Sequence, residues 1–340
     1  MSVTGVPELD ALIKGINKKA GRELVTDTIY ENHGVIPTGS VTLDCALRTG
    51  GIPQGRVIEI LGEPSGGKTS LCMSILAKAQ QKRLAEDPEC QKRDLVIDLE
   101  KTITGEFMRG FGINTDLVIH ARPSTADEAL QLARDLPRSG LIDIVMFDSV
   151  GAAQSERQAQ RNIGDVDVGG ISKLMHEALR NIVGTADETK TTYLFINHVT
   201  MNPGVRMGDP RTSPGGRALP YYTSVRLLLM TGKPHPTVPG AMQMRVQIKK
   251  NKMAPPFGND PISFAFTYGV GVDPVNEIMD LLHTAGRLRN SGGQTKIRVT
   301  EDAEWEVIDE SMEKGKAGCY DFLSKNPEAI ERLVKIYRSL

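Results

Sequence analysis

The feature that most constrains this chain is the stretch Gly62–Thr69, which reads Gly-Glu-Pro-Ser-Gly-Gly-Lys-Thr and completes the pattern G-x-x-x-x-G-K-[ST]. A short apolar run, Arg56–Leu61, precedes it, and a segment of helical character, Ser70–Gln80, follows it. A strand, a glycine-rich loop and a helix in this order let backbone N–H groups surround a polyphosphate at a helix N-terminus. These flanks argue against the alternative, a glycine-rich turn that happens to contain Lys-Thr, and they predict a nucleotide site.

Every residue of the loop is a candidate nucleotide contact. The glycines allow the backbone to approach the phosphates closely. We expect Lys68 to reach the β- and γ-phosphates, and the hydroxyl of Thr69 to bind Mg²⁺. The expected contacts in this stretch are Gly62, Glu63, Pro64, Ser65, Gly66, Gly67, Lys68, Thr69 and Ser70.

The composition is that of a globular protein of 340 residues, with 39% hydrophobic and 24% charged residues. The net charge is −1, so any nucleic-acid site must be a local patch. The cysteines lack C-x-x-C spacing, which indicates reduced thiols and no disulfide frame or zinc site: Cys45, Cys72, Cys90 and Cys319. No apolar run approaches the ~18–20 residues of a membrane span, and the N-terminus lacks the apolar h-region of a signal peptide. We therefore expect a cytoplasmic protein without a membrane partner.

Apolar runs and helical segments alternate between residue 36 and about residue 270. We expect strands at 56–61, 94–98, 116–120, 142–147, 191–197, 224–230 and 243–249, and helices at 69–86, 124–137 and 171–187. Strands that are apolar throughout, such as Ile142–Phe147, are typical of a sheet covered on both faces. The predicted fold class is α/β, with a mostly parallel, doubly wound sheet.

A short N-terminal segment precedes this core, and we place the domain boundaries at 1–35, 36–272 and 273–340. The segment contains an amphipathic helix at Val6–Ala20 and an extended piece at Glu23–Tyr30. One helix and one strand cannot bury their own apolar faces. The pattern alone leaves open whether they pack on the main domain or on a neighbouring subunit.

The segment after Asp273 predicts a small α+β domain. We expect a helix at Val275–Leu288, a hairpin at Thr295–Ile308 and two further helices, the last at Pro327–Leu340. Asn326 is the expected N-cap of the last helix, and Pro327 suits its first position.

Polar residues end three of the expected strands, where open α/β sheets bind their ligands. Asp148 can hold Mg²⁺ beside Thr69, or it caps a turn. Glu100 can orient and deprotonate an attacking water, or it pairs with Lys101 on the surface. His198 can contact the γ-phosphate and signal its presence to the following loop, or it is a packed or solvated imidazole.

From about Ile36 to Asp273, and more weakly to the C-terminus, the sequence resembles the RecA family of bacterial and phage homologous recombinases. The stretches that carry the resemblance occur in the family's order and spacing: Pro37–Leu47, Gly50–Arg56, Asp148–Val150, Phe195–Asn197, Pro214–Leu219 and Lys250–Phe257. The resemblance implies a RecA-like P-loop NTPase core that uses ATP and Mg²⁺. It also implies DNA-dependent ATP hydrolysis, assembly on single-stranded DNA, and strand exchange with homologous double-stranded DNA.

The resemblance also assigns site residues. Glu100 matches the catalytic glutamate of the family, and Phe107 matches the aromatic residue that stacks on adenine. Lys250 and Lys252 match two lysines that reach into the ATP site of the adjacent subunit, although the sequence alone favours a solvated basic turn. Such an arrangement requires a head-to-tail interface, which gives an open helical filament when the rotation does not close.

Two loops of the family bind DNA, at about Glu156–Gly170 and Val199–Arg217 in this chain. Contact through phosphates fits a protein that must accept any DNA sequence. The expected DNA contacts are Lys173, Arg180, Arg206, Arg211, Gly215, Gly216 and Arg217.

The chain departs from the family at His198, where glutamine is usual. Imidazole can donate one hydrogen bond there, but its reach differs. Met230 and Gln247 replace positions that are commonly basic in the region that holds the incoming duplex. Two alternatives to the recombinase remain: a ring-forming motor or helicase on the same core, and an ATP-gated recombination mediator.

Overall fold

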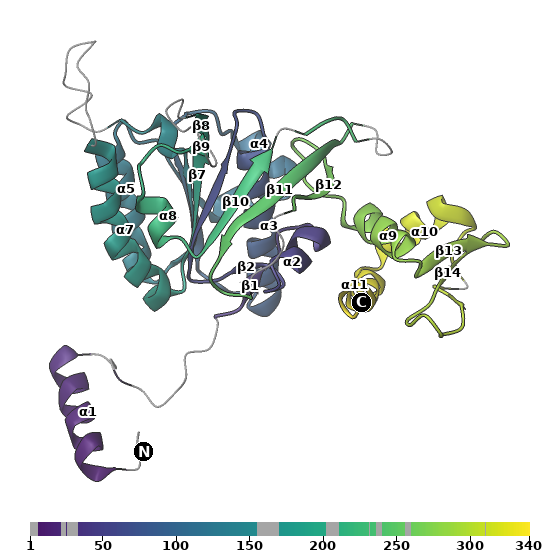
Figure 1. Ribbon diagram of the computed structural model, residues 1–340, viewed down its shortest axis with the longest axis horizontal. Helices are drawn as coiled ribbons and strands as arrows, with labels where there is room; N and C mark the ends of the chain where they lie inside the picture. Colours follow the sequence, from purple (N-terminus) through teal and green to yellow (C-terminus); the bar gives the residue numbers. More distant parts are fainter. Residues whose placement is uncertain are drawn as a thin grey trace. The chain divides into compact units, whose positions relative to one another are not determined.

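The structure is a computed structural model that describes residues 6–21, 25, 33–154, 170–201, 211–230, 232–235, 240–255, 260–309 and 311–340. The chain divides into two compact units, Met1–His33 and Gly34–Leu340 (Figure 1). The first unit contains helix α1, Pro7–Ala20, which begins one residue later than expected and ends at Gly21 in the left-handed conformation. Of the expected extended piece, all but Val25 lies outside the described residues.

Within the described part of the second unit, eight strands form one sheet in the order β12–β11–β10–β3–β7–β6–β4–β5. All pairs from β10 to β5 are parallel, and β10–β11 and β11–β12 are antiparallel. The strands are β3 (Val57–Gly62), β4 (Arg93–Asp98), β5 (Val118–Ala121), β6 (Ile142–Asp148), β7 (Thr192–His198), β10 (Val225–Met230), β11 (Met242–Asn251) and β12 (Ile262–Phe266). The mostly parallel sheet is confirmed, and the sequence analysis missed only its five-residue edge strand β12.

Alternate side chains of the strands enter two separate cores, as the pleat of a strand requires. Ile58, Ile60 and Val96 pack with α3 (Lys68–Glu86) on one face. Phe147 and Phe195 pack on the other face with α5 (Ala126–Asp135), α7 (Gly170–Thr189) and α8 (Ala218–Tyr222). Figure 1 shows these helices on opposite sides of the sheet. The doubly wound arrangement follows from this burial on both faces.

Short elements border this core. They are β1 (Val35–Ile36) paired with β2 (Ile52–Pro53), α2 (Val41–Ala46), α4 (Gly105–Gly110), and β8 (Thr200–Met201) paired with β9 (Arg211–Thr212). None of the described helices is long and apolar enough to span a membrane.

The segment from residue 274 has an apolar core separate from those of the sheet, and Val41 of α2 also packs into it. It contains α9 (Pro274–Thr284), β13 (Leu288–Ser291), β14 (Gln294–Ile297), β15 (Glu306–Val307), α10 (Gly315–Lys325) and α11 (Pro327–Arg338). The expected helix to Leu288 was too long, because Gly286 turns left-handed (φ 65°) and Leu288 begins β13. The expected pairing at Thr295–Ile308 is present as β14 and β15, with β13 as an additional strand.

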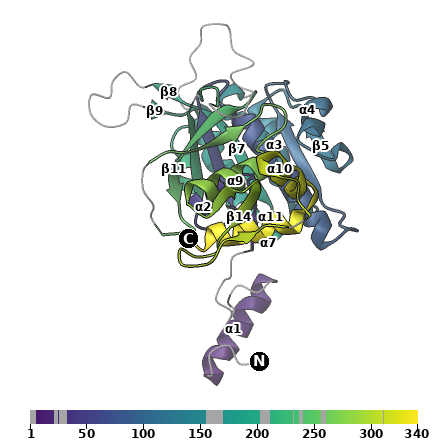
Figure 2. The same ribbon diagram turned by 90° about the vertical axis from the view of Figure 1, so that its right-hand side faces the viewer.

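Two details of this segment concern helix ends. Asn326 is the N-cap residue of α11 and Pro327 its first residue, as expected, but the Asn326 side chain accepts no capping hydrogen bond, and its amide nitrogen donates to the carbonyl of Phe322. Glu277 of α9 accepts hydrogen bonds from Ser40 Oγ (2.6 Å) and from the Val41 N–H (2.6 Å) at the start of α2. Burial raises the pKa of Glu277, and these bonds oppose part of that rise. Helices α2 and α9 lie side by side in Figure 2. The boundary at residue 273 stays a prediction.

Candidate nucleotide site and nucleic-acid interface

The glycine-rich loop joins β3 to α3 at the carboxyl ends of the parallel strands. A Cβ atom on Gly62 would lie 2.4 Å from the carbonyl oxygen of Leu229 on β10, which excludes any side chain there. Gly67 precedes α3 with φ +84°, and a Cβ atom would lie 2.7 Å from Met244 Cε. Both positions therefore require glycine, and α3 begins with its N-terminus directed at the loop.

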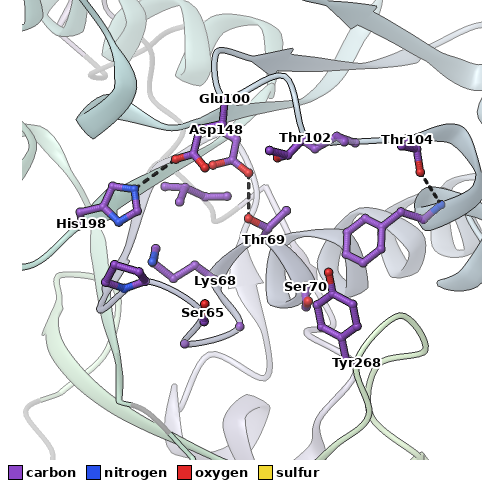
Figure 3. A pocket seen from close by; sticks show the side chains of 16 residues that line it. Ser65, Lys68, Thr69, Ser70, Glu100, Thr102, Thr104, Asp148, His198 and Tyr268 are labelled. Atoms are coloured by element: carbon purple, nitrogen blue, oxygen red, sulfur yellow. Dashed lines mark hydrogen bonds and ion pairs between the residues drawn. The ribbon is translucent and has the colours of Figure 1, made fainter.

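A cavity of about 770 Å³ lies beside this loop. Eleven of the residues expected from the sequence line it: Pro64, Ser65, Gly66, Gly67, Lys68, Thr69, Ser70, Glu100, Phe107, Asp148 and His198. Figure 3 shows Lys68 and Thr69 on one side, opposite Glu100 and Asp148. Gly62 and Glu63 do not line the cavity; Gly62 ends β3, and the Glu63 carbonyl accepts a hydrogen bond from Lys68. The sequence analysis missed five further lining residues, namely Thr102, Ile103, Thr104, Ile196 and Tyr268.

Lys68 is nearly buried, and its ammonium group donates to the carbonyl of Glu63 at 2.8 Å. Burial lowers the pKa of Lys68, while the carboxylates of Asp148 and Glu100 act in the opposite direction. The loop thus holds a cation that faces two acidic side chains across the cavity.

Asp148, the last residue of β6, accepts a hydrogen bond from the hydroxyl of Thr69 at 2.8 Å. Burial raises the pKa of Asp148 to about 6 despite this bond, and the nearby carboxylates of Glu100 and Asp98 contribute to the rise. A hydroxyl and a carboxylate side by side suit Mg²⁺, which takes one or two protein oxygens and completes its shell with phosphates and water. These two residues therefore fit the expected metal ion.

Glu100 follows β4, and Asp98 shapes the turn that brings it into the cavity. The Asp98 carboxylate accepts hydrogen bonds from the backbone of Thr102 (3.3 Å) and Ile103 (3.1 Å), and Lys101 adopts a left-handed conformation (φ 58°). The sequence left open whether Glu100 pairs with Lys101 on the surface. With this turn, Glu100 instead lines the cavity.

The carboxylate of Glu100 bonds to two other strand ends. Its Oε1 accepts from Ser149 Oγ at 2.5 Å and lies 3.1 Å from His198 Nε2. Burial raises the pKa of Glu100, but the hydrogen bonds from Ser149 and His198, with the charges of His198 and Lys68, produce a net lowering. Glu100 is therefore held as an ionised carboxylate, the form a general base requires. Ser149 was missed as a positioning group, although it directly follows the expected metal ligand Asp148.

His198 ends β7 and lies between this carboxylate and the start of the second loop. Its Nε2 is also 3.3 Å from Ser149 Oγ, whereas Nδ1 is buried without a partner among the described residues. Gly151 lies against the ring, because a Cβ atom there would be 2.5 Å from His198 Cδ2. The imidazole is held at the cavity and is not a solvated surface group.

Two aromatic rings border the far end of the cavity. Phe107 of α4 and Tyr268 have ring centroids 5.5 Å apart, and Tyr268 is 75% exposed. Figure 3 shows Tyr268 beside Ser70 at this end. Flat rings at this position can stack on a base. Tyr268 follows the unexpected strand β12, which explains why sequence reasoning did not connect it with Phe107.

Lys250 and Lys252 do not line the cavity. Lys250 lies near the end of β11, and its ammonium donates to the carbonyls of Pro220 (2.7 Å) and Tyr221 (3.3 Å) in α8. Burial lowers the pKa of Lys250 to about 8, and the charges of Lys252 and Arg226 add to the effect. Within one subunit, the lysine pair and the nucleotide cavity are thus separate.

The expected DNA contacts are only partly described. Lys173 and Arg180 are exposed on α7, seven residues and about two turns apart, so they share one helix face. Gly215 and Gly216 turn left-handed, and a Cβ atom on Gly216 would be 2.2 Å from Ser172 Oγ of α7. The start of α7 and the end of the second loop are therefore in contact.

Three arginines complete the set of expected DNA contacts: Arg206, Arg211 and Arg217. Arg217 is exposed directly after Gly216. The backbone of Arg211 belongs to β9. The side chain of Arg211, all of Arg206 and most of the first loop lie outside the described residues.

Comparison with known proteins agrees with this geometry. The family model of the RecA N-terminal domain matches residues 7–273. The chain belongs to the RecA family. The RecA protein of Syntrophus aciditrophicus is 35% identical over 338 residues, which cover 97% of this chain and 92% of that protein. RecA of Bdellovibrio bacteriovorus is 33% identical over 338 residues, covering 97% and 84%, and RecA of Nitratidesulfovibrio vulgaris is 37% identical over 294 residues, covering 84% and 78%.

Membership in the RecA family confirms both the predicted fold class and the predicted function. The chain has the α/β core of a RecA protein and functions as a recombinase in DNA recombination and repair, with binding of ATP and DNA. RecA proteins use a nucleotide and a metal ion. The match with RecA over nearly the whole chain favours the recombinase over a ring-forming motor or a mediator.

Proposed function

We propose that this RecA-family chain is a DNA-dependent ATPase that polymerises head-to-tail on single-stranded DNA and exchanges strands with a homologous duplex. The observation that carries the proposal is the division of the site. The cavity gathers Lys68, Glu100 and Asp148 in one subunit, whereas Lys250 lies elsewhere on the surface. A site that is complete only with a neighbour's cations couples hydrolysis to assembly.

ATP is the nucleotide we assign to the cavity. Ser65–Ser70 of the loop, which line the cavity, bind the phosphates through backbone N–H groups, with Lys68 at the β- and γ-phosphates. Phe107 and Tyr268 hold the adenine by stacking. Thr69 and Asp148 hold Mg²⁺, which would neutralise charge on the β- and γ-oxygens.

Glu100 acts as the general base that orients and deprotonates the attacking water. Its support is the lowered pKa of its carboxyl and the bonds to Ser149 and His198, which restrict its position. His198 contacts Glu100 on one side and begins the second DNA loop on the other. We therefore assign to His198 the coupling between bound nucleotide and bound DNA.

The neighbour completes the site. Lys250 and Lys252 stabilise the charge that develops on the phosphates, as an arginine finger does. Because the cavity and the lysines are different surfaces, the interface is heterologous and gives an open helix when the rotation does not close. Single-stranded DNA contacts Lys173, Arg180, Arg206, Arg211 and Arg217 through its phosphates, with the N–H groups of Gly215 and Gly216.

The test is ATP hydrolysis measured with and without single-stranded DNA, at low and high salt. Strong stimulation that weakens with salt is expected, because phosphate contacts release counterions. Hydrolysis that is indifferent to DNA would contradict the proposed coupling through His198. Electron microscopy of the same mixtures checks the assembly, since closed rings would favour a motor over a filament.

A further inference from the structure

A charged row crosses three adjacent strands of the sheet, away from the nucleotide cavity. Glu59 of β3 is opposite Arg226 of β10 in the ladder, and Arg226 is opposite Lys250 of β11. Residues directly opposite each other on neighbouring strands project to the same face. From β3 to β11, the row therefore consists of the carboxylate of Glu59, the guanidinium of Arg226 and the ammonium group of Lys250.

Glu59 is fully buried, and each of its oxygens is bonded. Oε2 lies 2.5 Å from Arg226 Nε, and Oε1 accepts from Asn197 Nδ2 at 3.0 Å. A buried ion pair contributes little stability over an apolar pair of similar shape, so its presence in an otherwise apolar strand points to a role other than stability.

Asn197 connects this row to both functional regions. Its Nδ2 also donates to the carbonyl of Pro214 at 3.0 Å, at the end of the second loop. Its Oδ1 accepts from the backbone N–H of His198 at 2.9 Å, beside the nucleotide cavity. One buried amide thus bonds to Glu59, to the DNA loop and to the residue that contacts Glu100.

At the other end of the row, Lys250 bonds to the segment that follows the second DNA loop. Lys250 Nζ donates to the carbonyls of Pro220 and Tyr221 in α8, six and seven residues after Pro214. The segment 214–222 is therefore fixed at its start by Asn197 and near its end by Lys250. A displacement of this segment must break the bond from Asn197, which contacts the Glu59 end of the row, and the bonds from Lys250 at the other end.

We propose that Glu59 is a positioning residue for Lys250, and that the row Glu59–Arg226–Lys250 couples the exit of the second DNA loop to the lysine that acts on the neighbouring subunit. This inference rests on the proposed function for its consequence, but the coupling itself is a property of one subunit. Glu59 offsets the repulsion that Arg226 and Lys252 exert on the Lys250 ammonium. The carbonyls of α8 hold that ammonium until the loop exit moves.

The charged groups that face Lys250 are Lys252 after β11, Arg226 on β10 and Glu59 on β3, while α8 presents the carbonyls. The pKa of Lys250 is lowered by burial first, then by Lys252 and Arg226, and Glu59 raises it. Glu59 and Lys250 are two strand spacings apart, about 10 Å, where a unit charge still shifts a pKa measurably inside a protein.

The experiment measures the pH at which Lys250 becomes half-reactive. The DNA-free protein is acetylated briefly between pH 6 and pH 10, and the modified lysines are located by mass spectrometry, with exposed Lys190 as internal control. Glu59→Gln keeps the shape and removes the charge, so the Lys250 midpoint should fall by about 0.5–1 pH unit. The double variant Glu59→Gln/Arg226→Gln also removes the repulsive cation, so the midpoint should return toward that of the wild type.

These two variants separate electrostatic coupling from simple disruption of the fold. A midpoint that is unchanged in Glu59→Gln, or that falls equally in both variants, overturns the proposal. Circular dichroism shows whether each variant is folded before it is titrated.

A second readout concerns the neighbour. In DNA-stimulated hydrolysis near pH 7.5, Glu59→Gln should lower kcat by about two- to threefold, because a smaller fraction of Lys250 is protonated. KM for ATP should not change, because Lys250 acts on the adjacent site while the cavity is intact. A change in KM alone would overturn the assignment. If the wild type shows no stimulation by DNA, the proposed function fails, and the Lys250 titration still decides whether the row exists.

Discussion

Two lysines with lowered pKa values lie in different surroundings, and the contrast separates the two halves of the site. Burial is the first cause in both. Lys68 then faces Asp148 and Glu100, whose charges favour its protonated form. Lys250 faces Lys252 and Arg226, whose charges disfavour it.

The difference shows which part of the site is complete within one subunit. The charge of Lys68 is already compensated by the carboxylates of Asp148 and Glu100 before any ligand binds. A bound phosphate then adds a further favourable interaction. The Lys250 ammonium has two cations and one carboxylate, Glu59, as charged neighbours, so a further anion brought to it would favour its protonated form. For Lys250, we infer that this anion is the phosphate of the neighbour's nucleotide.

Removal of the proposed general base should have the largest effect, and that effect should be confined to the cavity. Glu100→Gln should lower ATP hydrolysis by about 10²–10⁴-fold, because the amide cannot accept a proton from water. Nucleotide affinity should be retained, since Lys68 and Thr69 remain. Steady-state hydrolysis and equilibrium nucleotide binding are the two measurements. Glu106→Gln, an exposed residue of nearby α4, is the matched control, and a similar loss there would contradict the assignment.

Removal of Lys250, the lysine proposed to act in trans, should have the next largest effect. Lys250→Ala should lower DNA-stimulated hydrolysis by about 10²-fold or more, because a preorganised charge at the phosphates is lost. Binding of nucleotide by the isolated subunit should not change, because Lys250 does not line the cavity. The measurement is hydrolysis in assembled filaments alongside nucleotide binding at subunit concentrations too low for assembly.

The matched control for this variant is Lys249→Ala, the preceding exposed lysine on the same strand. Mixing Lys250→Ala with Glu100→Gln subunits should restore part of the activity, since some interfaces then combine an intact cavity with an intact lysine. No recovery in the mixture would argue that both residues act within one subunit.

The pH dependence of assembly should distinguish the two lysines. The pKa of Lys250 is about 8 in the free subunit, and contact with a neighbour's phosphate would raise it. Assembly above pH 8 must then take up a proton, so it should weaken as pH rises, by about tenfold between pH 7 and pH 9. Below pH 7, Lys250 is protonated in both states and adds no pH dependence.

The measurement is the critical concentration for assembly by light scattering, with a nucleotide that is not hydrolysed. Lys250→Arg should flatten the profile, because guanidinium stays charged throughout. Wild-type and Lys250→Arg curves that run parallel would refute the link between protonation and assembly.

The smallest effect is expected at the aromatic end of the cavity. Tyr268→Ala should weaken ATP binding by about three- to tenfold, the amount expected for one stacked ring. Hydrolysis at saturating ATP should not change, because Tyr268 does not contact Glu100 or Asp148. Titration of a fluorescent nucleotide measures the affinity. Val270→Ala in the same turn is the control, and equal effects of both variants would remove Tyr268 from the site.

Local patterns predicted the parts of this fold that depend on few residues. The phosphate loop and seven of the eight strands of the large sheet were found because each is a contiguous run with a glycine-rich, apolar or alternating apolar and polar pattern. The edge strand β12 was missed because five residues with mixed burial carry little periodic signal. Tyr268, which follows β12, was missed as well, because no local pattern connects it to Phe107.

The cluster around Glu100 shows why the rest of the site was harder to predict. Glu100, Ser149 and His198 follow three different strands, and the order β7–β6–β4 in the sheet places these strand ends together. The sequence analysis treated Glu100 and His198 as separate hypotheses and assigned no role to Ser149. Their hydrogen bonds are a consequence of strand order, which side-chain patterns do not encode.

Short contiguous stretches were enough to predict the α/β class, the phosphate loop, the polar strand ends and the resemblance to the RecA family, because each depends on residues adjacent in the chain. Only the tertiary structure decided that Lys250 bonds to α8, that Glu59 and Arg226 adjoin it, and that Asn197 connects them to the second loop. These contacts join residues far apart in sequence, and they arise from the register of neighbouring strands. Register is set by the packing of the whole sheet and not by any one segment.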